Sequence, residues 1–457
     1  MSKMVSRRDF LKMAGTAAGA IVLSACAPVA APTQAPATQA TPAAPAVKKA
    51  VKLRFWTHNY DPLVAFVQKK VEEYKSVKPG IEIEYAYAKV HDHEERLFTT
   101  LAAGTGPDGW NMGDWNYPLL STKGWLAPVS PAAFGKDTDQ EVMDMFFDFS
   151  LTGLVKEGKL YAIPFEWNAL DLYYHRGAFA EVGLDPDKPP QTWEEVTEYA
   201  IKLTKRDEAG NIIRPGFQQS YGPNPEWPFK RLHPMLVQAG FDFLDKTLTT
   251  CTLNTKEAIE IVEYYTDWTV KHKVAMQGFE VPGVKGNPFR AGYVAMDLSG
   301  PYNPAAIKRA NPNFVYKADD GWDVATFPQW SPPRLKKKAS ALWRWGLFVN
   351  NDSAYAEEMW AFIHFMVSDW RAVRNEVGYV PSIKGWTDDP ENIKDTPWLP
   401  VQMKDLEIGV PVPQTPKYQE LARQVLEMLE RIYDGSQTVS ESVTEACQKI
   451  DTILQTA

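Results

Sequence analysis

The chain has 457 residues, 44% of them apolar, and a formal net charge of −8 at neutral pH. This length is too great for one ordinary core and sufficient for two lobes, and an acidic chain without basic runs argues against nucleic acid as a partner. After the N-terminal segment no apolar run is long enough to span a membrane, so the folded part is expected to be soluble and globular.

The first 25 residues predict an export signal. Arg7 and Arg8 form a twin-arginine pattern ahead of an Ala- and Gly-rich stretch that is too short for a membrane span. The stretch ends in Leu-Ser-Ala-Cys, which resembles the bacterial lipobox and implies that Cys26 becomes the lipidated first residue of the mature protein. Residues 1–25 carry four basic and one acidic residue, so their removal takes the net charge from −8 to −11.

Residues 26–50 predict an extended tether. After Cys26 they consist almost entirely of Ala, Pro, Thr, Gln and Val, a composition that cannot bury a core. At about 3.1 Å per residue, such a chain could hold a domain several tens of ångströms from a lipid surface. We therefore expect an exported, membrane-anchored lipoprotein at the cell surface or in the periplasm.

From residue 51 onward the apolar pattern alternates between strand and helix periods. Residues 51–56 alternate as a half-buried strand, residues 62–80 carry helical spacing up to a Pro-Gly stop, and residues 81–88 alternate again. A connection of this length favours parallel pairing and an α/β lobe. Further helices are predicted at 94–104, 192–206 (with Thr192 and Glu195 as a capping box), 255–273, 354–368 and 418–435.

Cysteine and histidine usage gives little support for a metal site. Beyond Cys26 the chain has only Cys251 and Cys447, which could pair in an oxidising compartment; the sequence leaves this open. The one cluster of metal-binding residue types, His91 to Glu95, leads into an amphipathic pattern and is better explained as the start of a helix. We expect neither a metal nor any other cofactor.

A series of motifs resembles one protein family. The segments are LRFWT at 53–57, LAAGTGPD at 101–108, GKLYAIPFEWNALDLYYHRGAFAEVGLD at 158–185, VAMDLSGPYN at 294–303 and AEEMWAFIHFMVS at 356–368. In this order they resemble the extracellular solute-binding proteins that deliver sugars to ABC importers, the group that contains the maltose-type binding proteins. The resemblance covers nearly all of residues 51–457.

This resemblance implies an α/β fold of two lobes, the periplasmic-binding-protein-like fold, with a hinge and a ligand cleft between the lobes. It implies crossings near Pro164, Leu342 and Gly378. One lobe would then comprise 51–163 and 342–376, and the other 164–341 and 377–457. The resemblance also implies a monomer without catalytic activity that hands its ligand to permease subunits in the membrane.

A sugar site needs flat aromatic platforms for the C–H faces of the ring and polar side chains for its hydroxyl rim. The chain has 16 Trp, several of them in predicted loops, although each could instead seal a core. By resemblance, Asn168 occupies a position that contacts hydroxyls and Tyr302 that of a platform, while Arg290 stays unassigned. The candidate ligand-binding residues are Trp56, His58, Asp114, Trp115, Glu166, Trp167, Asn168, Trp227, Tyr302, Trp343, Arg344 and Trp345.

The run Trp343-Arg344-Trp345 admits two interpretations. Strand alternation would make both rings core filling, whereas the resemblance places the three residues ahead of a strand at 346–350, beside the cleft. The second interpretation predicts that Arg344→Ala and Trp345→Ala weaken ligand binding more than they lower the stability of the empty protein.

The expected function is therefore the capture of a carbohydrate, an oligosaccharide in view of the tryptophan supply, by closure of two lobes. A secreted glycosidase is one alternative; it would need a pair of carboxylates across the scissile bond. A binding protein for glycerol phosphate, a peptide or iron is the other. A phosphate would call for a Gly-rich turn at a helix start, which only residues 102–109 approach.

Overall fold

The computed structural model describes residues 50–219, 225–386 and 390–456. The predicted export signal, the lipidation at Cys26 and the tether lie outside these residues. Among the helices in the described ranges, none is both long and apolar enough to cross a membrane.

The first elements are the strand, helix and strand that the periodicity predicts. β1 (Val51–His58) pairs in parallel with β2 (Ile81–Ala88), and α2 (Asp61–Val77) connects them. Pro62 lies in the first turn of α2, where a missing N–H costs nothing, and the helix ends before Pro79. The predicted parallel pairing is thus confirmed.

The His- and Glu-rich cluster at 91–95 lies in α3 (Val90–Ala102), which confirms the helix interpretation. Nε2 of His93 lies 2.8 Å from the carbonyl oxygen of Asn111. β3 (Gly109–Gly113) follows and pairs in parallel with β1. In the described part of the chain, no group of three or more His, Cys, Asp or Glu residues could hold a metal ion.

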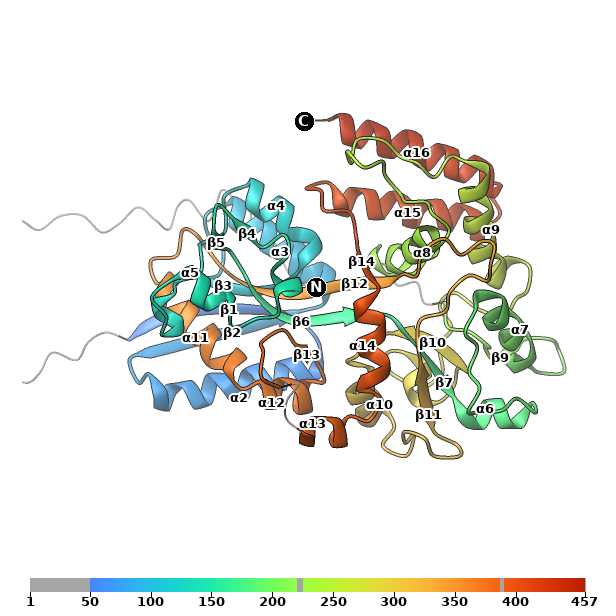
Figure 1. The fold of residues 1–457 in the computed structure, drawn as a ribbon, viewed down its shortest axis with the longest axis horizontal. Coiled ribbons are helices and arrows are strands. Elements are labelled where there is room, and N and C mark those ends of the chain that lie inside the picture. Colours follow the sequence, from blue (N-terminus) through green and yellow to red (C-terminus); the bar gives the residue numbers. More distant parts are fainter. Residues whose placement is uncertain (1–49, 220–224, 387–389, 457) are drawn as a thin grey trace, which may run out of the picture. The chain divides into compact units, whose positions relative to one another are not determined.

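These strands belong to a seven-stranded sheet of order β13-β6-β12-β3-β1-β2, with β14 beside β12 (Figure 1). β12 (Ser340–Val349) is antiparallel to both β3 and β6 (Ile163–Ala169). Two short strands, β13 (Val380–Pro381) and β14 (Gly409–Pro411), complete it. One core cluster joins this sheet to α2 and to the predicted helix α11 (Ala356–Ser368).

The placement of the Trp-Arg-Trp run corrects one prediction. Residues 343–345 lie within β12 and not ahead of it, because the strand starts at Ser340. Trp343 pairs with Asn168 and Trp345 with Glu166, so backbone pairing with β6 extends the strand toward its N-terminal end. Alternation places the two tryptophans on one face of the sheet and Arg344 on the other.

A second, three-stranded sheet has β7 (Asp171–His175) at its centre, antiparallel to β10 (Met296–Ser299) and β11 (Trp322–Ala325). Beside it lies α7 (Trp193–Leu203), which begins with the predicted capping box. The Thr192 hydroxyl accepts from the backbone N–H of Glu195, and the Glu195 carboxylate accepts from that of Thr192.

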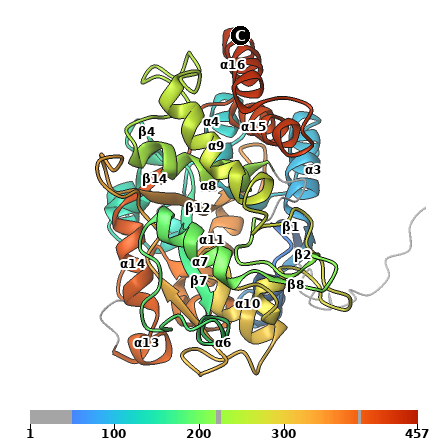
Figure 2. The same ribbon diagram turned by 90° about the vertical axis from the view of Figure 1, so that its right-hand side faces the viewer.

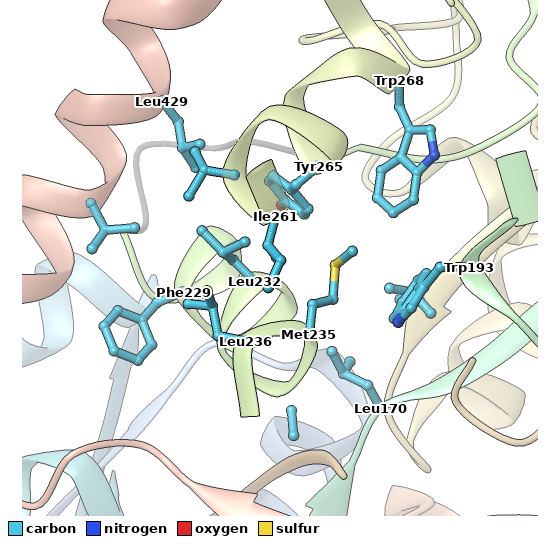
Figure 3. Close-up of a cluster of buried hydrophobic side chains, with 14 of the residues drawn as sticks. Leu170, Trp193, Phe229, Leu232, Met235, Leu236, Ile261, Tyr265, Trp268 and Leu429 are labelled. Atoms are coloured by element: carbon cyan, nitrogen blue, oxygen red, sulfur yellow. The ribbon is translucent and has the colours of Figure 1, made fainter. Parts of the chain in front are cut away.

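The main core of this half joins α8 (Glu226–Gln238) and α9 (Lys256–Val270) to two C-terminal helices, α15 (Tyr418–Tyr433) and α16 (Val439–Gln455). Figure 2 shows the two C-terminal helices, in red, near α8 and α9. Figure 3 shows how side chains of α8, α9 and α15 meet Trp193 and Leu170, with Leu232, Met235, Ile261, Trp268 and Leu429 among them.

Short elements connect the larger ones. They are η1 (Asp114–Asn116), α4 (Tyr117–Thr122), η2 (Ala132–Phe134), α5 (Asp139–Met143), η3 (Asp148–Leu151), β4 (Val155–Lys156), β5 (Lys159–Leu160), α6 (Arg176–Glu181), β8 (Lys205–Arg206), β9 (Ile212–Arg214), η4 (Pro288–Ala291), α10 (Asn303–Ala310), α12 (Trp370–Ala372), η5 (Val373–Val377), α13 (Pro390–Asp395) and α14 (Leu399–Glu407).

A disulfide joins Cys251 and Cys447, which answers the question that the sequence left open. It links the segment ahead of α9 to α16 across 196 residues of sequence. The bond therefore holds the C-terminal helix against the second core.

The chain passes between the two sheets at Leu170, since β6 lies in the first and β7 in the second. It returns at the start of β12, and the segment with β13, α14 and β14 provides a further connection. The residue limits of the lobes given above remain a proposal.

Two carboxyl groups meet at this passage. Asp171 at the start of β7 and Asp405 on α14 are both buried, and each affects the ionisation of the other. Burial, and then the like charge of Asp405, raises the pKa of Asp171 well above its ordinary value, and burial raises the pKa of Asp405 to about 7. The folded chain thus binds more protons than the unfolded chain, so stability falls as the pH rises from about 4 to about 7.

We therefore expect Asp405→Asn to raise the melting temperature by roughly 2 °C or more at pH 8 and to leave it nearly unchanged at pH 4. The amide cannot ionise, yet it keeps an acceptor for the backbone N–H of Phe327, which donates to Asp405 at 2.7 Å. Calorimetric melting between pH 4 and pH 8 measures the effect, with the exposed Glu407→Gln on the same helix as control. An Asp405→Asn variant that keeps the wild-type pH dependence would contradict the assignment of this pH dependence to the Asp171 and Asp405 pair.

Candidate functional site

A cavity of about 190 Å³ lies where the end of β1 and inner residues of β6 and β12 meet α8 and the turn before α10. Both core regions contribute to its wall, because β1 belongs to the first sheet and α8 packs in the second half. The cavity is lined by His58, Asn59, Tyr60, Val90, Trp115, Glu166, Glu226, Trp227, Lys230, Arg290, Tyr302, Trp343, Trp345 and Tyr379.

Aromatic rings form most of the wall. Trp115 meets Trp345 edge to face at 5.3 Å between ring centroids, and Trp227 meets Trp343 in the same way at 6.0 Å. His58 stacks on Trp345 at 3.9 Å. These contacts fix the rings in place before a ligand arrives, and flat rings of fixed orientation suit the C–H face of a sugar.

In a second group of rings on the cavity wall, Tyr60 stacks on Tyr379 at 5.6 Å and meets the ring of Tyr302 at 5.9 Å. Its hydroxyl donates to the carbonyl oxygens of Tyr302, at 3.2 Å, and Val377, at 3.0 Å. Tyr60 follows β1 of the first sheet, while Tyr302 precedes α10 in the second half, so this contact joins the two halves at the cavity.

One cation is held among these rings. Lys230 Nζ lies 3.7 Å from the ring centroid of Trp115 and 4.8 Å from that of Trp343. The same atom donates to a carboxylate oxygen of Glu226 at 3.0 Å, one helical turn away on α8. Lys230 is thus held by a charge partner and by the electron-rich faces of two indoles.

A buried polar network connects the floor of the cavity to three helices. The Gln419 amide on α15 donates to Glu94 at 3.2 Å, to Asn116 at 3.2 Å and to Glu226 at 3.0 Å. Burial, and then the nearby charge of Glu226, raises the pKa of Glu94 well above its ordinary value. The Trp115 indole N–H also donates to Glu94, which fixes the ring that faces the cavity.

Glu166 supplies a polar group from β6. Burial raises the pKa of Glu166 well above its ordinary value; the Asn168 amide opposes this shift, although no well-formed hydrogen bond joins the two side chains. Its Oε2 has no hydrogen-bond partner among the described residues. This carboxyl group is therefore available for a hydrogen bond with a hydroxyl of a ligand.

The structure brings together seven of the twelve residues predicted from the sequence. Those that line the cavity are His58, Trp115, Glu166, Trp227, Tyr302, Trp343 and Trp345. Those that lie outside its wall are Trp56, Asp114, Trp167, Asn168 and Arg344.

The residues outside the wall have other partners. Trp56 belongs to the first core, with the Arg96 guanidinium 3.8 Å from its ring centroid, and Trp167 packs in a small cluster on the other face of β6. Asn168 is fully buried on β6. The Arg344 Nε donates to Asp114 at 3.0 Å and its Nη1 to the carbonyl oxygen of Ser150 at 2.7 Å.

Several wall residues are not among those predicted from the sequence. Glu226 and Lys230 were not predicted because their Pro-rich segment shows no clear helical period. Their spacing of four residues is nevertheless typical of a Glu-Lys pair on a helix. Tyr60 directly follows β1, a position where ligand groups are common in open α/β sheets. Asn59, Val90 and Tyr379 lie in no local sequence pattern that predicts a ligand contact. Arg290 had no predicted role.

Other hollows also lie in the described structure. A chamber of about 160 Å³ adjoins the cavity beyond Trp227 and Tyr302. A wider hollow of about 910 Å³ lies along α2 and α11, with mostly charged or small side chains on its wall. We place the candidate site at the smaller cavity and its chamber, because strand ends and aromatic rings converge there.

Comparison with known proteins identifies the family of the chain. The family of bacterial extracellular solute-binding proteins matches residues 59–369. A putative binding protein of Brucella abortus is 24% identical over 398 residues, which cover 84% of this chain and 88% of the relative.

Two solved structures show the same fold. A solute-binding protein of Thermotoga lettingae, bound with α-D-tagatose, has a TM-score of 0.75 and 21% identity, and covers 89% of this chain and 100% of its own. A maltose-bound protein of T. maritima has a TM-score of 0.74 and 18% identity, and covers 88% and 100%. The predicted two-lobe α/β fold of the periplasmic binding proteins is thereby confirmed.

Proposed function

We propose that the chain, which belongs to the family of bacterial extracellular solute-binding proteins, captures a carbohydrate in this cavity and delivers it to a membrane permease. The protein is a solute-binding component of an ABC transporter and not an enzyme, so the glycosidase alternative is removed. The observation that carries the sugar proposal is the cavity wall, where four indole rings surround a small number of polar groups.

The size of the site favours a short ligand. The cavity of about 190 Å³ and its chamber of about 160 Å³ are small beside the 300 to 1,000 Å³ of common ligand pockets. The expectation of an oligosaccharide rested on the supply of tryptophan, yet many of these rings fill cores. We therefore propose a ligand of one or two sugar rings. Apart from Trp115 of the cavity wall, the fully buried tryptophans are Trp110, Trp193, Trp268, Trp330, Trp360 and Trp386.

Closure of the two lobes on the ligand is the proposed mechanism of capture. It is supported by the contacts of Tyr60 with Tyr302 and of Gln419 with Glu94, each of which joins the halves near the cavity. Crossing segments at Leu170 and the start of β12 can act as hinges, because few residues have to change their backbone angles. A ligand that contacts both walls would favour the closed state.

For residues 1–50 we keep the proposals made from the sequence. A twin-arginine signal would export the protein, the Cys26 thiol would carry the lipid, and the Pro-rich segment would act as the tether. The carbohydrate and the permease are the proposed partners of a monomeric protein.

A thermal-shift screen tests the sugar proposal. A bound sugar at about 100 times its Kd adds about 2.7 kcal/mol of stability, so the correct mono- or disaccharide should raise the melting temperature by several degrees. Amino acids, peptides, ferric ion and glycerol 3-phosphate serve as the comparison set. The sugar proposal fails if a compound of that set shifts the melting curve and no carbohydrate does.

A further inference from the structure

The chamber next to the candidate sugar cavity is rich in cationic side chains. It is lined by Trp227, Arg231, Asn287, Arg290, Leu298, Ser299 and Tyr302, and it holds two arginines. Trp227, Arg290 and Tyr302 also line the cavity, so the two spaces adjoin at these side chains. A ligand that occupies both spaces would contact all three.

The two arginines differ in how their charges are balanced. Arg231 is buried and donates to Asp297 at 3.1 Å, and the Asn287 amide donates to the other oxygen of that carboxylate at 2.7 Å. The negative charge of Asp297 is thus balanced by Arg231, and Asn287 donates a further hydrogen bond to it. The Arg231 Nε is a buried donor that lacks a hydrogen-bond partner in the described part of the chain.

Arg290 has no such counterion. Its Nε donates to the neutral Asn303 side chain at 2.9 Å, and its Cζ lies 5.8 Å from the ring centroid of Tyr302. Among the described residues, no carboxylate lies within ion-pair distance of this half-buried guanidinium. The bond through Nε orients the group and leaves its two terminal nitrogens available to the chamber.

The other charged residues of the site do not provide a counterion for Arg290. Lys230 and Glu226 neutralise each other at 3.0 Å. Glu166 lines the cavity and not the chamber. Arg290 is therefore the one charged side chain of the chamber without an ion-pair partner among the described residues, although its charge also acts on Asp297 from beyond ion-pair distance.

We infer that the ligand is an acidic carbohydrate whose anionic group, a carboxylate or a phosphate, enters the chamber and is bound by Arg290. The inference rests on the proposed sugar function and names its substrate class. The planar guanidinium can hold two oxygens of the anion at once, and the Ser299 and Arg231 side chains of the same chamber can donate further hydrogen bonds. The sugar ring itself lies against Trp227 and the other rings of the cavity.

Isothermal titration calorimetry with matched sugars tests this inference. The probes are glucose and galactose, the corresponding glucuronic and galacturonic acids, the corresponding 6-phosphates, and the matching disaccharides with and without a uronic acid. We expect an acidic member to bind about 10- to 100-fold more tightly than its neutral parent, the range of a charge-assisted hydrogen-bonded contact. The carboxylate and phosphate series show which anion the chamber accepts.

Substitution at Arg290 supplies the control. Arg290→Gln should lower the affinity for the acidic sugar much more than that for the neutral parent and so abolish the preference, while Arg290→Lys should keep part of the preference because the charge remains. Arg309→Gln, an exposed arginine on α10, should change neither. Melting of each variant without ligand shows whether the fold is retained.

The outcomes separate the two proposals. If neutral sugars bind as well as acidic ones and Arg290→Gln leaves both affinities unchanged, the acidic-sugar inference fails and the sugar function stands. If no sugar of either kind binds the folded protein, the sugar function itself fails. Preference for an acidic sugar that survives Arg290→Gln would overturn the assignment to the chamber.

Discussion

Replacement of Arg344 by methionine is expected to lower the free energy of unfolding by about 3 to 5 kcal/mol, the usual cost of removing one partner of a buried ion pair. The Arg344 guanidinium is buried, lies 3.0 Å from Asp114, and also donates to the backbone carbonyls of Ser150 and Thr152. Methionine fills part of the space and leaves Asp114 as a buried, unpaired carboxylate. Urea unfolding of wild type and variant measures the difference.

The loss should depend on pH. Burial already raises the pKa of Asp114, and the charge of Arg344 opposes this shift, so the variant raises the pKa further. Because a carboxyl with a raised folded pKa binds its proton more tightly when folded, the variant should lose least stability near pH 4 and most near pH 8.

Two further variants isolate the ion pair. The double variant Asp114→Asn with Arg344→Met should recover part of the loss, since it leaves no unpaired charge. Arg334→Met, which breaks a partly exposed pair with Glu260 at 3.8 Å, should cost less than about 1 kcal/mol. A stable Arg344→Met protein with weakened sugar binding would instead support the original expectation that Arg344 contacts the ligand.

Arg344 illustrates which features of the structure can be predicted from the sequence and which cannot. Local rules predicted the strands and helices at 51–88 and the capping box at Thr192, because each depends on residues a few positions apart. The hydrogen-bond partners of Arg344 lie at residues 114, 150 and 152. Because these positions are far from Arg344 in the sequence, no local pattern predicts the contacts. The strand limits at 340–349 were missed for the same reason, since they depend on pairing with β6.

The aromatic residues of the site show the same limit. Residue type and loop position predicted that several tryptophans line a cleft, and Trp115, Trp227, Trp343 and Trp345 do so. Type and position could not separate them from Trp56 and Trp167, which face cores one or two positions away from wall residues. The side of a strand on which a ring falls is set by the pairing register, which the sequence alone does not supply.

Trp227→Ala is expected to weaken sugar binding by about 100-fold or more, because the ring offers one of the largest apolar faces available to a ligand. Trp227 lines both the cavity and the chamber, so its ring can contact the sugar at the point where the two spaces join. It is only half-buried in the empty protein, whereas Trp343 and Trp345 are buried. Its removal should therefore cost little stability compared with that of a core tryptophan.

The measurement is the affinity for the sugar identified by the thermal-shift screen, together with the melting temperature of each protein without ligand. Trp125→Ala is the matched control, since Trp125 is also half-buried but packs beside Phe98 in the first core, away from the cavity. The control should keep wild-type affinity, and Trp227→Phe should keep part of it because a smaller ring remains. If Trp227→Ala binds the sugar as tightly as wild type, the ring is not a platform, and the site must lie on the other wall, around Tyr60 and Tyr302.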